Sequence, residues 1–161
     1  MTRVFIHGLE SSSQGTKGQY FRSKFPHMII EDYTGSLKNR MAKLNAVLAG
    51  KTDLILVGSS YGGLMAAMYA CAHPEKVKKL ILLAPALNLA AFRPYLKNRL
   101  TMPTILYQGR HDDVVPPAPV REIAGRLFSD LQYHLVDDDH PLTRSFETLN
   151  WDALLEAPVN N

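Results

Sequence analysis

Short runs of apolar residues alternate along this chain with stretches in which apolar residues recur every three or four positions. Runs of this length are typical of buried strands, whereas the longer period is typical of helices. Such an alternation predicts a mostly parallel sheet that helices cover on both faces. The apolar runs predict six strands, at residues 4–6, 28–30, 54–57, 80–83, 104–107 and 132–136.

Helices are expected between most of these strands. A polar loop at residues 10–18 follows the first strand, and a helix over residues 37–48 follows the second, with Gly50 as its C-terminal cap. The helix that begins near residue 61 carries small alanines, which allow close packing on a sheet. Two further apolar stripes predict a helix over residues 120–128 and a closing helix marked by Leu142, Phe146, Leu149 and Ala153.

These elements together predict a three-layer α/β/α sandwich around a mostly parallel sheet of about six strands. The length of 161 residues fits a single domain, which we place at residues 1–156, followed by a loose tail at residues 157–161. Ligands of open parallel sheets bind beyond the carboxyl ends of the strands. The chemically informative residues are therefore expected just after strands.

Composition and charge narrow the class of protein. The net charge of +3 is spread along the chain, and we interpret its tightest cluster, Lys76, Lys78 and Lys79, as a solvated helix end rather than a nucleic-acid site. The single cysteine, Cys71, excludes an intramolecular disulfide and is interpreted as an inert thiol. No apolar run reaches the length of a membrane span or a signal peptide, so we expect a cytoplasmic protein without a membrane partner. The oligomeric state is left open.

The strongest chemical signal is the pattern Gly58-x-Ser60-x-Gly62 between a strand and a helix. This is the setting of a nucleophile elbow, in which a serine occupies a strained turn between small neighbours. Ser59 fits less well, because positions 57 and 61 hold valine and tyrosine instead of glycine. The pattern alone also fits a Gly/Ser-rich turn without catalytic function, so the prediction of a nucleophile needs support from further residues.

Two such residues follow later strands. Asp112 lies in the segment 109–116 after the fifth strand, and His140 directly follows the last strand. Imidazole is the natural general base near neutral pH, and a carboxylate can hold it in the required tautomer. Either residue alone is most simply a surface or capping residue. The order Ser60, Asp112, His140, with each after a different strand, predicts a catalytic triad.

A third group of residues can stabilise an oxyanion. Acyl transfer needs donors aimed at the developing negative charge, and backbone N–H groups usually supply them. We predict the N–H groups of Tyr61, the residue after the nucleophile, and of Leu9 in the early loop. His7 and Gly8, at the end of the first strand, are expected to support this loop structurally, as Gly58 and Gly62 support the elbow.

With these residues in place, the chain resembles the α/β-hydrolase superfamily, and within it the small lidless bacterial esterases of the YqiA type. The resemblance implies hydrolysis of a small ester or thioester through an acyl-enzyme on a serine, without a cofactor, and it implies that Asp112 rather than Asp113 is the acid. Residues 86–101 leave room for one small helix at most, so no lid is expected. The residues that carry the resemblance are His7-Gly8 with Ser11-Ser12-Ser13, the segment 58–63, the segment 109–116, and His140.

Some of these residues also fit other interpretations. His111, His140 and nearby aspartates offer ligands that suit a divalent metal, but we favour a solvated loop for Asp137, Asp138 and Asp139 and expect no metal. Tyr61 and Leu87 are expected to line the acyl pocket, and Trp151 to lie in the core. A non-catalytic binding protein on the same scaffold remains the alternative function. Absence of turnover despite an intact triad would distinguish it.

Overall fold

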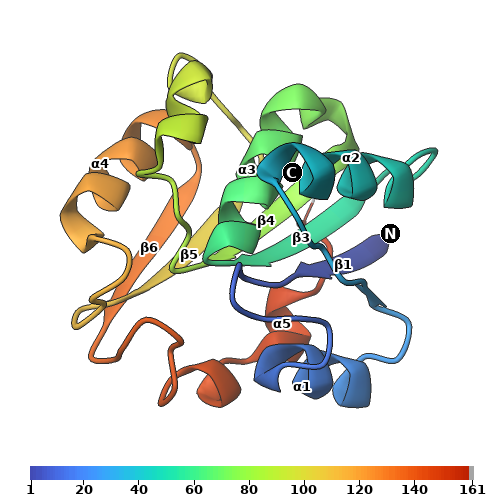
Figure 1. The fold of residues 1–161 in the computed structure, drawn as a ribbon, viewed down its shortest axis with the longest axis horizontal. Helices are drawn as coiled ribbons and strands as arrows, with labels where there is room; N and C mark the ends of the chain where they lie inside the picture. The colour runs from blue at the N-terminus through green and yellow to red at the C-terminus, as the bar shows by residue number, and fades with distance from the viewer. Residues whose placement is uncertain (160–161) are drawn as a thin grey trace.

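The computed structural model describes residues 1–159 and contains one sheet of six parallel strands in the order β2-β1-β3-β4-β5-β6 (Figure 1). The predicted parallel sheet is therefore confirmed, with small shifts in the strand ends. Residues 160 and 161 of the predicted tail lie outside the described residues. The strands are β1 (Thr2–Ile6), β2 (Ile29–Ile30), β3 (Leu54–Ser59), β4 (Val77–Leu83), β5 (Thr104–Gly109) and β6 (Leu131–Val136).

Helices cover both faces of the sheet, as the three-layer prediction requires. The α-helices are α1 (Thr16–Lys24), α2 (Leu37–Val47), α3 (Tyr61–Ala72), α4 (Pro117–Leu127) and α5 (Trp151–Leu154), and the 3-10 helices are η1 (Pro74–Lys76), η2 (Ala90–Tyr95) and η3 (Phe146–Thr148). Helices α2, α3 and α4 lie on one face, and α1 and α5 lie on the other (Figure 1). Among residues 1–159, no helix has the length and apolar character that crossing a bilayer requires.

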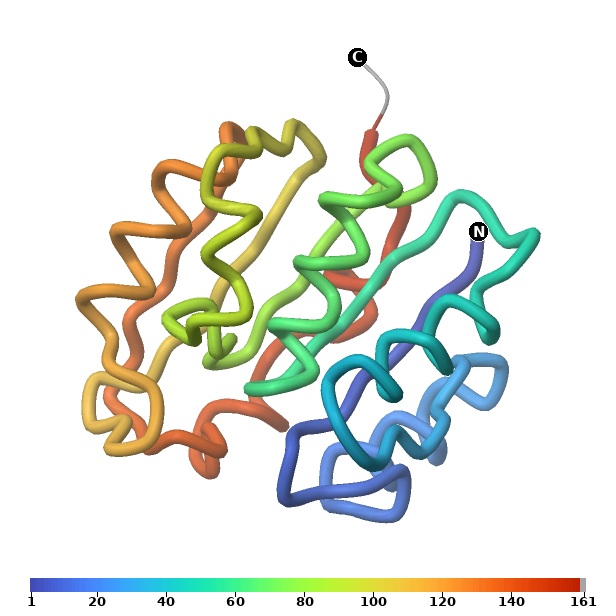
Figure 2. Tube along the Cα trace, turned by 45° about the horizontal axis from the view of Figure 1, so that its top comes forward, coloured from blue at the N-terminus to red at the C-terminus, as the bar shows by residue number. Residues whose placement is uncertain are grey.

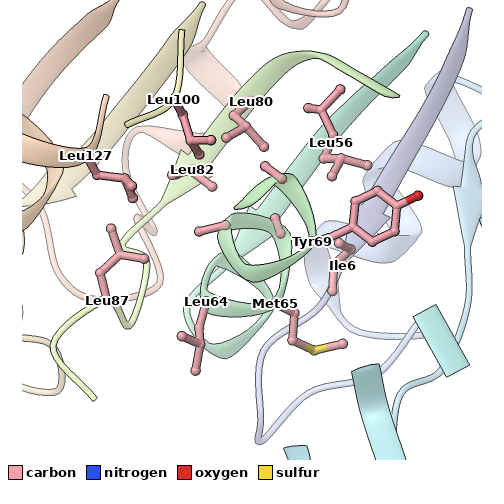
Figure 3. Close-up of a cluster of buried hydrophobic side chains, with 14 of the residues drawn as sticks. Ile6, Leu56, Leu64, Met65, Tyr69, Leu80, Leu82, Leu87, Leu100 and Leu127 are labelled. Atoms are coloured by element: carbon pink, nitrogen blue, oxygen red, sulfur yellow. The ribbon is translucent and has the colours of Figure 1, made fainter. Parts of the chain in front are cut away.

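The strands have apolar side chains on both faces because both faces are covered. Successive side chains of a strand point to opposite faces. Leu56 of β3 belongs to the same core cluster as Leu64 and Met65 of α3 (Figure 3). Ile55 and Val57 of the same strand belong to the cluster on the opposite face. The second cluster contains Trp151, whose ring centroid lies 4.8 Å from that of Phe21. The predicted core position of Trp151 is confirmed.

The predicted closing helix is wrong as a single element. Its stripe is divided between η3 and α5. Leu142, its first apolar position, has a φ of 56°, which an α-helix does not permit. Asn150 then caps a new helix, because its side-chain oxygen accepts the N–H of Ala153. Leu142 and Phe146 reach the core as predicted, from a loop and a short helix, whereas Leu149 is half-buried and Ala153 is exposed.

Three further details differ from the sequence-based expectation. Lys78 and Lys79 lie in β4 instead of at a helix end, and Lys79 is buried with its Nζ 3.3 Å from the carbonyl oxygen of Glu156. Helix α1 begins within the predicted polar loop. The sequence did not predict this helix, because residues 16–24 have too few apolar positions to form a helical stripe. Gly50, with a φ of 75°, lies two residues beyond Leu48, the residue that caps α2.

The sheet brings the carboxyl ends of the strands to one edge. Ile6 pairs with Gly58, Ser59 pairs with Leu83, and Gly109 pairs with Val136, so these strands end at nearly the same level. The loops after β1, β3, β5 and β6 therefore emerge along this edge (Figure 2). All the predicted catalytic residues lie in these loops.

Candidate active site

Ser60 occupies a strained turn between β3 and α3. Its φ and ψ are 55° and −113°, in a region that residues other than glycine rarely adopt. Such a conformation costs on the order of 1–3 kcal/mol and persists only where the surroundings enforce it. The N–H of Ser60 donates to the carbonyl oxygen of Leu83 at 2.8 Å, and its own carbonyl accepts from Gly63 and Leu64 in the first turn of α3. The turn lifts the Ser60 side chain to the edge of the sheet.

The glycines around Ser60 leave no space for a side chain. A Cβ at Gly58 would overlap the carbonyl oxygen of Gly62, and a Cβ at Gly62 would overlap the carbonyl oxygen of Ile6. A Cβ at Gly63 would approach Pro85, which follows β4. The close approach of α3 to β1 and β3 thus depends on Gly58 and Gly62.

His140 connects Ser60 to Asp112. Nε2 of His140 lies 3.0 Å from Oγ of Ser60, and Nδ1 lies 2.7 Å from Oδ2 of Asp112. The side chain of His140 is 16% exposed, and that of Asp112 is fully buried. The structure thus brings together the three residues that the sequence singled out, in one hydrogen-bonded chain. This series of hydrogen bonds requires the His140 tautomer in which Nδ1–H donates to Asp112 and Nε2 can accept the Ser60 proton.

Asp112 is held as a carboxylate by several donors. Its Oδ1 accepts the N–H groups of Val114 and Val115 at 2.9 and 2.8 Å, and its Oδ2 accepts Nε2–H of Gln108 at 2.9 Å. Burial by itself raises the pKa of Asp112, but the hydrogen bonds from His140 and these donors outweigh it and hold the pKa below its usual value. The neighbouring Asp113 is exposed.

Sequence reasoning missed Gln108. This residue is fully buried in β5, and its amide nitrogen donates to Oδ2 of Asp112. The available signal was a polar side chain in an otherwise apolar strand, directly before the segment of the acid. Buried polar groups need a partner, so such a residue indicates a polar neighbour close by.

The three consecutive aspartates do not form a uniformly solvated loop. Asp137 and Asp139 are exposed, but Asp138 is only 3% exposed and accepts backbone hydrogen bonds. The solvated-loop prediction is therefore wrong for Asp138. Its carboxylate faces inward because the loop turns around it, which no periodicity in the sequence could indicate. Within residues 1–159, no three His, Cys, Asp or Glu side chains gather in a way that could hold a metal ion.

His7 lies buried at the end of β1. Its Nδ1 lies 2.7 Å from the carbonyl oxygen of Gly8, and its Nε2 lies 2.9 Å from the backbone nitrogen of Tyr33. Nδ1–H therefore donates to Gly8, and Nε2 accepts from Tyr33, which defines a neutral ring. Burial is the main cause that lowers the pKa of His7. His7 thus joins the loop after β1 to the segment after β2.

Leu9 and Tyr61 line the same cleft as Ser60 and His140. A Cβ placed on Gly8 would lie 3.5 Å from Cβ of Ser60, so the loop that carries Leu9 passes directly beside the nucleophile. Within residues 1–159, the N–H groups of Leu9 and Tyr61 donate to no protein acceptor. Both donors are therefore available to a bound group.

The cleft has a volume of about 910 Å³ and mainly apolar walls. Leu9, Leu89 and Val114 line it although each is more than a third exposed, which gives the cleft an apolar rim. Tyr61 lines the cleft as expected, but Leu87 is buried in the core, so its predicted place in the pocket is wrong.

Residues 84–103, all described, carry only the short η2, which confirms the prediction of one small helix.

Cys71 lies outside this site, on α3. Burial raises the pKa of its thiol to about 11, so the thiol stays protonated at neutral pH. A protonated thiol is a poor nucleophile and a poor metal ligand. This agrees with the interpretation of Cys71 as inert.

Comparison with known proteins places this chain in a family. Residues 10–98, which include the turn at Ser60, match the sequence profile described as alpha/beta hydrolase fold. The chain belongs to the alpha/beta hydrolase family. Membership agrees with the resemblance seen in the sequence. The matched segment ends before Asp112 and His140.

Curated relatives match about half of this chain. Homoserine O-succinyltransferase from Ectopseudomonas mendocina (strain ymp) is 31% identical over 81 residues, which are 50% of this chain and 20% of that protein. This chain thus spans about a fifth of the length of the curated relatives that it matches.

Two solved structures illustrate the shared fold. Est1E from Butyrivibrio proteoclasticus aligns with a TM-score of 0.76 at 18% identity, covering 91% of this chain and 82% of that one. Mouse alpha/beta hydrolase domain-containing protein 10 aligns with a TM-score of 0.71 at 24% identity, covering 87% of this chain and 82% of that one. At these identities the likeness establishes the fold.

Proposed function

We propose that this protein is a serine hydrolase that cleaves small carboxylic esters or thioesters through an acyl-enzyme on Ser60. The observation that carries the proposal is the hydrogen-bonded chain from Ser60 through His140 to Asp112, which opens into an apolar cleft. A strained serine, an imidazole and a buried carboxylate in this order are the groups that nucleophilic acyl transfer uses.

In the acylation step, Oγ of Ser60 attacks the carbonyl carbon of the substrate while Nε2 of His140 takes the hydroxyl proton. The carbonyl oxygen becomes an oxyanion, which the N–H groups of Leu9 and Tyr61 stabilise. Asp112, held ionised by its donors, stabilises the imidazolium that forms. His140 then protonates the leaving alcohol or thiol, the bond to the leaving group breaks, and the acyl group remains on Ser60.

In the deacylation step, a water molecule takes the place of the leaving group. His140 removes a proton from this water as its oxygen attacks the acyl carbon. The bond between Oγ of Ser60 and the acyl carbon then breaks, and His140 returns the proton to Oγ. The products are a carboxylic acid and the free serine.

A second candidate function is acyl transfer to an alcohol or amine instead of water. The similarity of half the chain to homoserine O-succinyltransferase favours this second candidate function. Both functions share the acylation step and differ only in the acceptor. Product analysis with a fixed ester and rising concentrations of an alcohol separates them, because a transferase forms the new ester in preference to the acid.

The test is mass spectrometry after treatment with a fluorophosphonate probe. We expect one adduct, located on Ser60 by peptide mapping, that is absent from Ser60→Ala. Ser23→Ala, which removes an exposed hydroxyl on α1, is the matched control and should label like the wild type. Turnover of p-nitrophenyl acetate should follow the same pattern.

Folding has to be measured on the same samples. If the wild type has a normal circular dichroism spectrum but takes up no probe and hydrolyses no ester or thioester, the serine hydrolase is excluded. The non-catalytic binding protein then becomes the better hypothesis.

A further inference from the structure

Asp138 lies two positions before His140 and points into the loop that carries it. Oδ1 of Asp138 accepts the N–H of Asp139 at 2.8 Å. Oδ2 accepts the N–H groups of Arg144 and Ser145 at 3.0 and 2.7 Å. One carboxylate thus joins the start of the loop to its end and encloses His140 between them.

A buried carboxylate is costly unless donors replace its water. Asp138 is 3% exposed, and burial by itself raises its pKa. The donors from Asp139, Ser145 and Arg144 outweigh this effect and hold the pKa below its usual value. Asp138 is therefore ionised, with most of its hydrogen-bonding capacity used within this loop.

The backbone of Asp138 contacts the segment of the catalytic acid as well. Its carbonyl oxygen accepts the N–H of His111 at 3.0 Å, one residue before Asp112. Gly109 packs so closely that an added Cβ would lie 2.6 Å from this same carbonyl oxygen. Asp138 thus contacts both the loop of the base and the loop of the acid, so its position affects the bond between His140 and Asp112.

The loop that Asp138 closes is itself strained. Leu142 has a φ of 56°, although it is not a glycine, and its side chain is fully buried beside the cleft. A residue in this conformation relaxes when its surroundings loosen. Loss of the Asp138 hydrogen bonds would let residues 139–145 relax, and His140 would move with them.

We propose that Asp138 is a positioning residue that sets the place of His140 between Ser60 and Asp112. The inference rests on the proposed function for its kinetic consequence, but its geometric consequence is independent of turnover. A shift of about 1 Å in a catalytic group can reduce the rate on the order of 100-fold. The effect should appear in kcat rather than KM, since Asp138 does not line the cleft.

The test compares Asp138→Asn with Asp130→Asn, which makes the same change of charge on an exposed side chain outside the cleft. The amide of Asp138→Asn keeps the shape but turns one acceptor oxygen into a donor that faces backbone N–H groups. We expect kcat to fall roughly 10- to 100-fold with little change in KM, and the rate of fluorophosphonate labelling to fall in parallel. Asp130→Asn should stay close to the wild type.

The decisive readout is the proton resonance of His140 Nδ1–H. Its hydrogen bond to Asp112 should place it far downfield in the wild type and in Asp130→Asn, and it should be lost or shifted upfield in Asp138→Asn. If Asp138→Asn melts at a lower temperature but keeps kcat and this resonance, Asp138 is only structural and the proposal is wrong.

A second variant tests the proposal if Asp138→Asn is unfolded, and the resonance tests it if the wild type is inactive. If Asp138→Asn does not fold, Ser145→Pro removes one N–H donor while keeping Asp138; the φ of Ser145, −90°, is near the range of proline. It should shift the resonance and lower kcat several-fold, and an unchanged resonance would count against the proposal. If the wild type shows neither labelling nor turnover, the proposed function fails, yet the resonance still decides whether Asp138 positions His140.

Discussion

Oγ of Ser60 lies 3.0 Å from Nε2 of His140, although 80 positions separate the two residues in the sequence. Ser60 follows β3 and His140 follows β6, with β4 and β5 between them in the sheet. Three strand spacings of 4.8 Å amount to about 14 Å. The loop after β6 must therefore run back along the edge of the sheet to bring the imidazole to the serine.

The identity of the acid can be tested with neighbouring substitutions. Asp112→Asn should lower kcat on the order of 10³- to 10⁴-fold, because an amide favours the wrong imidazole tautomer and cannot stabilise the imidazolium. Asp113→Asn should leave kcat near the wild-type value, since Asp113 is exposed. Steady-state kinetics on p-nitrophenyl acetate measure both, and a larger loss for Asp113→Asn would transfer the role to that residue.

The proposed oxyanion donor in the early loop can be removed by proline. Leu9→Pro lacks the backbone N–H and should lower kcat on the order of 10²- to 10³-fold. Leu9→Ala keeps the N–H and shortens a side chain that is 47% exposed, so it should act mainly through KM. Equal values of kcat in the two variants would show that the second donor lies elsewhere.

The packing of α3 on the sheet depends on Gly62. Gly62→Ala should lower the free energy of unfolding by about 3 kcal/mol, because its Cβ meets the carbonyl oxygen of Ile6, a backbone atom that cannot rotate away. Gly125→Ala is the matched control in α4, where an added Cβ meets nothing within 4 Å. It should raise stability by roughly 0.5–1 kcal/mol through helix propensity. Urea midpoints at constant m-value provide the comparison.

The neutral ring of His7 predicts a dependence of stability on pH. Burial lowers the pKa of His7 below its usual value of 6.5, so the unfolded chain binds a proton more readily than the folded one. The stabilisation is fully present above pH 6.5 and is lost as the pH falls through the lower folded value. Melting temperatures between pH 8 and 5 should fall more steeply in the wild type than in His7→Gln, which does not titrate. Parallel curves would mean that His7 does not contribute to the slope.

Much of the site could be predicted because its residues carry local patterns. The glycines around Ser60 identify a tight turn between a strand and a helix, whatever surrounds it. The positions of Asp112 and His140 after strands identify the edge of the sheet, because parallel strands have their carboxyl ends on one side. The choice of Asp112 over Asp113 came from the family resemblance, and the donors from Val114 and Val115 give it a physical basis.

Other features became visible only in three dimensions. Gln108 was missed because a single polar residue in a strand does not say which group it will meet. Asp138 was misjudged because three consecutive aspartates look alike until the loop turns one of them inward. The prediction of one closing helix was wrong because Leu142 and Asn150 interrupt the stripe, although Leu142 and Phe146 still reach the core.

By itself, therefore, the sequence determined the parallel sheet, its two apolar faces, the turn at Ser60 and the edge on which the chemistry lies. These follow from periodicity and from the steric limits of single residues, which act over a few neighbouring positions. Only the tertiary structure decided the distance between Ser60 and His140, the burial of Asp138 and the donors to Asp112. Those depend on contacts between segments far apart in the chain, where the path of each loop is fixed by what it packs against.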